Sequence, residues 1–147
     1  MNDAVRSIVQ RNTLASAVIG AVLSPIPLID ELVLIPFYLR MAAKIGRSHA
    51  LARGQMPWRP VTRTTLNGLL ARAAVNVTVS YIPGVAAAAN AASAAALTAL
   101  LGNYIDDACA DPKGAQPIGV KAIVGVLKEK LSAAVARHST SSPSHPA

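Results

Sequence analysis

The chain has 147 residues, a formal net charge of +7, and a composition that is 52% hydrophobic but only 3% aromatic. This length fits one domain with a sizeable core, and an apolar content made mostly of alanine and valine favours close-packed helices over a sandwich or barrel. The single cysteine, Cys109, excludes an internal disulfide framework and a cysteine-cluster zinc site, and fits a reducing cytosol.

The first part of the chain predicts two helices joined by a proline turn. Residues 3–23 form the first, and its second half is apolar nearly all round, so we expect it to be buried in protein or in lipid. Pro25 and Pro27 end it, because proline clashes with the preceding turn and lacks the donor that a helix interior needs. The second helix begins near Pro27, and we expect Pro36 to kink or divide it.

The rest of the chain predicts a second hairpin and one further helix. The expected order is hairpin one at 3–46, a basic linker at 47–62, hairpin two at 63–107 with its break at Pro83 and Gly84, a C-terminal helix at 118–137, and a disordered tail at 138–147. The last helix is amphipathic with lysines on its polar side, and it either packs on the bundle or lies on a membrane. We therefore predict one all-α domain over residues 1–137.

An internal repeat is visible at a separation of 56 residues. Ser24, Ile26, Pro27, Ala43 and Gly46 recur as Ser80, Ile82, Pro83, Ala99 and Gly102. The shared Ser-x-Ile-Pro with a glycine at a fixed distance predicts two sequence-related helical hairpins, each with an Ile-Pro turn. The turn residues are Pro25, Pro27, Pro83 and Gly84.

The same two turns carry a resemblance to a known family. "PIPLIDELVLIPFYLRMAAKIG" followed by "YIPGVAAAANAASAAALTALLGNYI" resembles domain of unknown function 697, the YcjF-like bacterial family, over roughly residues 14–107. The residues that carry it are Pro25, Pro27, Asp30, Pro36, Arg40, Met41, Ile45, Pro83, Gly84, Thr98, Leu101 and Gly102. The resemblance implies a helical, often membrane-associated domain without assigned chemistry, which in some relatives follows a small P-loop GTPase domain. This chain has no G-x-x-x-x-G-K-[ST] motif of its own, so a GTPase would have to act in trans.

The acidic pair Asp30 and Glu31 is the main candidate for a functional site. One interpretation is an acidic site near a membrane turn for a cation or proton, since intramembrane acids are costly and tend to be functional. The other is a helix N-terminus whose acids complement the macrodipole and pair with an arginine such as Arg40. Adjacent helical residues point about 100° apart and make a poor two-carboxylate active site. The capping interpretation is therefore favoured.

A basic stretch surrounds the only tryptophan. Seven cations and no acid lie in the stretch from Arg40 to Arg72. Nucleic-acid binding is nevertheless not expected, because Trp58 is the only aromatic residue in this stretch that could stack on bases. Trp58 with Arg53, Arg59 and Arg63 could contact lipid headgroups at a membrane surface. Alternatively, Trp58 covers the end of the helical core beneath a loop. The sequence leaves both interpretations open.

No residues are arranged for catalysis, and no cofactor or metal site is predicted. The histidines lack metal-ligand spacing and are expected to be solvated, His49 in the basic linker and the other two in or beside the tail. No serine lies in a G-x-S-x-G motif. Cys109 follows Asp106 and Asp107, which raise a thiol pKa rather than activate the thiol.

These observations predict a non-enzymatic, membrane-associated scaffold or assembly module that self-associates. Residues 73–105 contain no charged residue, a length that exceeds a membrane-spanning helix. The return leg of the first hairpin, however, is too short to cross a bilayer a second time. We therefore expect shallow association on the cytoplasmic side of a membrane. Two further functions fit the same sequence: a soluble cytosolic adaptor for a partner such as a GTPase, and an oligomeric ion or proton pathway lined by Asp30 and Glu31.

Overall fold

Helices account for all the regular secondary structure in the part of the chain that is described. The computed structural model describes residues 3–22, 29–79 and 86–140, without the side chains of 29–32, 78–79, 86 and 134–140. The elements are α1 (Asp3–Val22), α2 (Ile29–Ser48), the 3-10 helix η1 (Arg53–Gln55), α3 (Trp58–Val79), α4 (Ala86–Ala110) and α5 (Val120–Thr140). The all-α prediction is confirmed.

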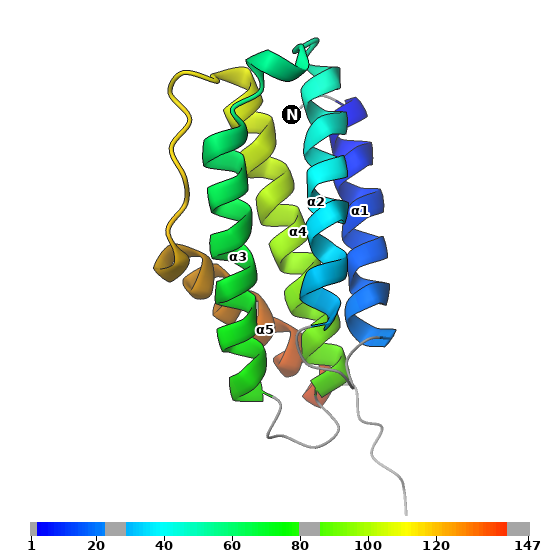
Figure 1. Ribbon diagram of the computed structural model, residues 1–147. Helices are drawn as coiled ribbons and strands as arrows, with labels where there is room; N and C mark the ends of the chain where they lie inside the picture. The colour runs from blue at the N-terminus through cyan, green and yellow to red at the C-terminus, as the bar shows by residue number, and fades with distance from the viewer. Residues whose placement is uncertain (1–2, 23–28, 80–85, 141–147) are drawn as a thin grey trace, which may run out of the picture.

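Helices α1 to α4 form a four-helix bundle in which successive helices run in opposite directions (Figure 1). The helices α2 and α4 contact each other across the middle, and α1 and α3 each contact both of them from opposite sides (Figure 1). Helix α5 crosses α3 and α4, against which it buries Ile123, Leu127 and Leu131. Its apolar stripe is therefore used for packing on the bundle.

Helices α1 and α4 pack closely because glycines lie between them. A Cβ at Gly20 would come within 2.8 Å of the Asn90 carbonyl oxygen, and a Cβ at Gly102 within 2.5 Å of Val9 Cγ2. A short polar chain crosses the same region: Thr98 Oγ1 lies 2.7 Å from Ser16 Oγ and 3.4 Å from Tyr38 Oη. These contacts connect α1, α2 and α4 inside the core, where a hydroxyl needs a hydrogen-bond partner.

Helix α3 begins earlier than the sequence predicts. The linker expected at 47–62 is shorter, because α2 continues to Ser48 and α3 starts at Trp58. Pro60 is compatible with the helix because it lies in the first turn, where backbone N–H groups have no intrahelical acceptor. The first helical hydrogen bond of α3 runs from Val61 N–H to the Pro57 carbonyl, 3.1 Å.

Pro36 does not divide α2, which is one helix from Ile29 to Ser48 with the proline inside it. Its ring lies on the exposed side of the helix, where water can reach the carbonyl that has lost its donor, while Leu34 and Tyr38 on the other side are fully buried. Packing on both sides of the proline holds the two parts of the helix together.

The remaining bounds differ by a few residues. Helix α4 ends at Ala110 instead of 107, and α5 spans Val120–Thr140 instead of 118–137. Residues 138–140 of the predicted tail are thus helical, and 141–147 lie outside the described residues. The turn residues Pro25, Pro27, Pro83 and Gly84 also lie outside them, so the Ile-Pro turns and the internal repeat stay predictions.

Candidate functional site

The predicted acidic pair lies in the first turn of α2, but its side chains are outside the described part of the structure. Helix α2 begins at Ile29, which places Asp30 and Glu31 at its second and third positions. The backbone position agrees with the expected helix N-terminus. Neither the cation site nor the pairing with Arg40 is tested by it.

The outward face of α1 changes character halfway along the helix. Its first half exposes Asp3, Ala4, Arg6, Ser7, Gln10 and Arg11, and its second half exposes Leu14, Val18, Ala21 and Val22. The large side chains of the second half are strongly exposed, with Leu14 at 71%, Val18 at 62% and Val22 at 68%. A helix normally turns its apolar residues to the core and its polar residues outward. The second half of α1 is apolar on its outward side as well.

Helices α2 and α3 repeat this change in the same direction along the bundle. Toward the end where α2 begins and α3 ends, the exposed large residues are Val33 on α2 and Leu70 and Val77 on α3, while Leu39 and Leu66 are exposed near the middle of their helices. At the other end, the exposed residues include Arg40, Lys44 and Arg47 on α2 and Arg59 and Arg63 on α3. We call these the apolar end and the charged end of the four-helix bundle.

Two exposed apolar surfaces result, on opposite sides of the α2–α4 pair. The first, here called the α1–α2 surface, is formed mainly by Leu14, Val18 and Val22 on one face of α1. Val33 and Leu39 are also exposed on α2 and point about 120° apart around that helix. The second, the α3 stripe, consists of Leu66, Leu70 and Val77. Helix α5 packs on α3 and α4, with exposed Lys121, Lys128 and Lys130. Helix α5 therefore packs on the side of the bundle formed by α3 and α4, whereas α1 contacts α2 and α4.

Arg72, on α3 near the apolar end, is fully buried, although the sequence groups it with the basic stretch. Its Nε donates to Ser93 Oγ at 3.2 Å, and Nη2 donates to the Asn90 carbonyl at 3.5 Å. Ser93 Oγ also lies 3.1 Å from Asn76 Oδ1. A buried guanidinium is costly unless its donors are hydrogen-bonded, so this polar cluster is a fixed feature of the core.

The predicted headgroup contacts lie at the charged end. Arg53, Arg59 and Arg63 are exposed, whereas Trp58 is partly buried and packs against the core. The indole Nε1 donates to the Arg53 carbonyl at 3.0 Å. Trp58 thus covers the end of the core, while the three arginines remain open to a partner.

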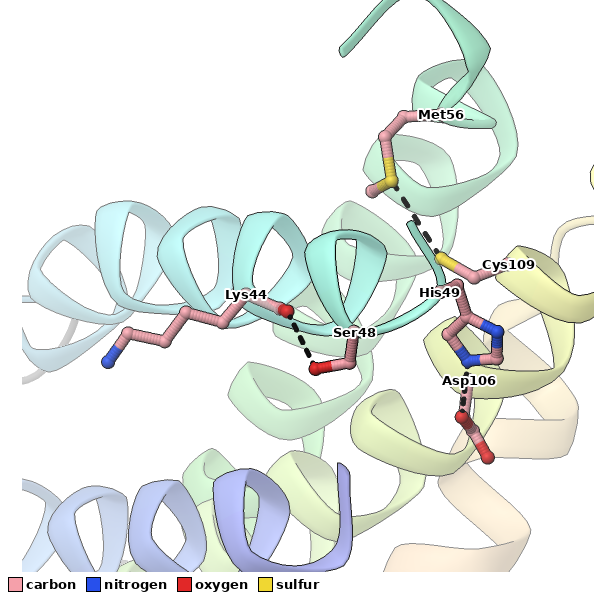
Figure 2. A network of polar contacts seen from close by, with 6 residues as sticks. All are labelled: Lys44, Ser48, His49, Met56, Asp106 and Cys109. Atoms are coloured by element: carbon pink, nitrogen blue, oxygen red, sulfur yellow. Dashed lines mark hydrogen bonds and ion pairs between the residues drawn. The ribbon is translucent and has the colours of Figure 1, made fainter. Parts of the chain in front are cut away.

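His49 is not a solvated histidine, and this prediction is wrong. Its Nε2 lies 2.7 Å from Asp106 Oδ1, and the His49 side chain is only 24% exposed (Figure 2). This contact joins the C-terminal ends of α2 and α4. The sequence carries one signal for it: His49 and Asp106 follow Gly46 and Gly102, the paired glycines of the predicted repeat, by about one helical turn.

Cys109 lies beside this pair but is not an activated thiol. Its Sγ is 3.8 Å from Met56 Sδ, and the residue is 3% exposed (Figure 2). Burial, and to a lesser degree the nearby Asp106 carboxylate, raise the pKa of Cys109 to about 11. The thiol is therefore protonated at neutral pH and a poor nucleophile. The direction of this shift agrees with the sequence prediction, but its main cause is burial and not the neighbouring acids.

The described residues offer no cluster of three or more histidine, cysteine, aspartate or glutamate side chains that could hold a metal ion. Within the same ranges, no helix combines the length and hydropathy needed to cross a bilayer. The described residues instead form two exposed apolar surfaces, the α1–α2 surface and the α3 stripe, and a group of exposed cations at the charged end. This arrangement suits binding to a surface or a partner.

Comparison of the chain with models of protein families, with curated proteins and with solved structures finds no match. The resemblance to domain of unknown function 697 stays a prediction.

Proposed function

We propose that this protein is a non-enzymatic helical module that attaches to an anionic membrane through its α1–α2 surface. The supporting observation is the exposed apolar second half of α1, where Leu14 is 71% and Val18 62% exposed to water. Covering a large aliphatic side chain is worth about 1.5–3 kcal/mol. Covering several of them gives a substantial driving force for association.

The length of the apolar part of α1 and the two cations at the border of the surface suit shallow insertion, whereas Asp30 and Glu31 at the start of α2 oppose deep insertion. From Leu14 to Val22 the helix rises about 12 Å, less than half the hydrocarbon thickness of a bilayer. Arg11 and Arg40 are exposed at the border where the apolar parts of α1 and α2 end. Each cation near an anionic leaflet contributes about 1 kcal/mol. Aliphatic side chains would enter the leaflet while the two arginines meet headgroup phosphates.

Vesicle flotation tests this proposal. The wild-type protein is expected to float with phosphatidylcholine vesicles that contain phosphatidylglycerol, and less with phosphatidylcholine alone. The double variant Leu14→Ser/Val18→Ser should lose at least about tenfold in binding. Ser7→Ala/Gln10→Ala, on the polar half of the same helix face, is the matched control and should float like the wild type. A wild-type protein that floats with neither vesicle, or a Leu14→Ser/Val18→Ser variant that floats equally well, contradicts the proposal.

Self-association is a second candidate, favoured by the α3 stripe. A single flat membrane cannot cover both apolar surfaces, because α1 and α3 lie on opposite sides of the α2–α4 pair (Figure 1). Leu66 and Leu70 are 50% and 63% exposed and one helical turn apart, a spacing that a second copy could match. Sedimentation without lipid should give an oligomer for the wild type and a monomer for Leu66→Ser/Leu70→Ser. A monomeric wild type at all concentrations would remove this candidate.

The adaptor function and the ion-pathway function stay predictions. A GTPase acting in trans calls for a nucleotide-dependent pull-down. An ion or proton pathway requires that Asp30→Asn change flux into liposomes, and an unchanged flux would remove it.

A further inference from the structure

A second binding feature lies at the charged end, apart from the apolar surfaces. A pocket of about 370 Å³ opens between α2, η1 and the start of α3. Its lining includes Arg40, Lys44, Arg47, Arg53, Met56 and Trp58. We propose that this pocket binds the phosphate of an organic phosphate whose apolar or aromatic body lies against Met56 and Trp58. The volume is at the lower end of the range for small-ligand sites, which suits a single phosphorylated molecule or headgroup.

The inner wall of the pocket is fixed by packing. Met56 is 8% exposed, and its thioether occupies the space that a side chain at position 46 would fill, so the close approach depends on Gly46. The Trp58 indole is oriented by its hydrogen bond to the Arg53 carbonyl, 3.0 Å. This bond uses the only donor of the indole. Trp58 therefore offers the pocket an apolar ring rather than a polar group.

The rim is positively charged on two sides. Arg40, Lys44 and Arg47 are spaced four and three residues apart, which places them on one face of α2. Arg53 comes from η1, and all four cations are exposed. Among the described residues none of the four forms an ion pair, and no acid lines the pocket. Arg47 also complements the C-terminal end of the α2 dipole, but Arg53 lies beyond that helix.

A phosphate group fits this combination better than other anions. The guanidinium group offers paired donors in a planar fork that matches phosphate oxygens, and several cations can share its two negative charges. An apolar wall beside clustered cations strengthens the local potential and selects an anion that carries an apolar body. The same chemistry is present in a soluble phosphomonoester and in a lipid with a phosphomonoester headgroup.

Trp58 supplies the readout, because it is the only tryptophan in the chain. Titration with phenyl phosphate is expected to change tryptophan emission saturably, and at lower concentrations than inorganic phosphate. Phenol, which has the ring without the charge, should leave the emission unchanged at the same concentrations. An absent response to phenyl phosphate, or an equal response to phenol, overturns the proposal.

Vesicles then distinguish the two sources of the phosphate. If vesicles with phosphatidic acid saturate the emission change at lower phosphate concentration than phenyl phosphate does, the ligand is the lipid headgroup. If phenyl phosphate acts at the lower concentration, the ligand is a soluble organic phosphate. Both outcomes support a phosphate site.

Variants separate a built site from general electrostatic attraction. Arg53→Gln and Arg47→Gln should each weaken phenyl phosphate binding roughly tenfold, about 1.4 kcal/mol. Arg63→Gln removes the same charge from α3 outside the pocket and should stay within about twofold of the wild type. All three residues are exposed, so the fold is unaffected and circular dichroism verifies it. Equal losses in Arg53→Gln and Arg63→Gln overturn the proposal. Flotation of Arg53→Gln tests the α1–α2 surface separately.

Discussion

At the charged end of the bundle, the cations of α2, η1 and the start of α3 are exposed to water, and the His49–Asp106 contact is within reach of solvent. At the apolar end, Arg72 is fully buried in a polar cluster, and the outward faces of α1, α2 and α3 carry aliphatic side chains. Among the described side chains of α1, α2 and α3, the exposed charges lie toward the charged end, and the arginine nearest the apolar end, Arg72, is buried. Asp30 and Glu31 begin α2 at the apolar end, and their side chains lie outside the described part of the structure. The proposed membrane attachment rests on this difference between the two ends.

Arg72→Ala tests how much the buried polar cluster near the apolar end stabilises the fold, and it has the largest expected effect on stability. The substitution removes a large, fully buried side chain together with the hydrogen bonds that Arg72 donates to Ser93 Oγ and to the Asn90 carbonyl. We expect the free energy of unfolding to fall by about 3 kcal/mol or more in urea denaturation. Arg63→Ala, an exposed arginine of the same helix, should change it by less than about 0.5 kcal/mol. Similar losses in both variants would show that the ends do not differ.

The close approach of α1 to α4 near the apolar end is tested by Gly20→Ala. The added methyl group would come within 2.8 Å of the Asn90 carbonyl oxygen. We expect a loss of about 1–3 kcal/mol in the free energy of unfolding. Gly125→Ala is the matched control: nothing lies within 4 Å of a Cβ there, in the middle of α5. That variant should gain about 0.5–1 kcal/mol through helix propensity. A neutral Gly20→Ala would contradict the close α1–α4 packing.

His49→Ala at the charged end should cost less. The contact with Asp106 is 2.7 Å long, but the His49 side chain is 24% exposed, so water replaces part of the interaction. We expect the free energy of unfolding to fall by about 1 kcal/mol, measured by thermal and urea unfolding at neutral pH. A loss as large as that of Arg72→Ala would mean that both ends depend equally on buried charge.

Leu14→Ser/Val18→Ser should have the smallest effect on stability. Both side chains are mostly exposed, at 71% and 62%, so the free energy of unfolding should change by no more than about 0.5 kcal/mol. Any loss of vesicle binding is then a surface effect. A drop of several kcal/mol would instead show that these residues belong to the core.

Much of the fold follows from local sequence signals. Apolar periodicity and proline positions predict the five helices to within a few residues at most ends. The main error is the start of α3, because Pro57 and Pro60 indicate a loop whereas Pro60 fits a first helical turn. The continuity of α2 through Pro36 depends on the tertiary burial of Leu34 and Tyr38, which no local signal reveals.

The candidate surfaces could be predicted only in part. The sequence shows that the second half of α1 is apolar all round, but not which side α4 covers and which remains exposed. Counting charges along the chain wrongly places Arg72 in the exposed basic stretch, although its side chain is buried. On a helical projection it follows Gly68 and Leu69, which are both buried, by one turn. The His49–Asp106 contact joins residues 57 positions apart and depends on the parallel packing of α2 and α4.

The most direct test compares the two halves of α1 on the membrane. Ser7→Cys and Val18→Cys, each in a Cys109→Ala background, place an environment-sensitive fluorophore on the polar and the apolar half of the same exposed face. On addition of vesicles containing phosphatidylglycerol, the probe at position 18 should shift its emission to shorter wavelength and become protected from an aqueous quencher. The probe at position 7 should remain accessible. No shift at position 18, or equal shifts at both positions, would contradict attachment through the apolar half.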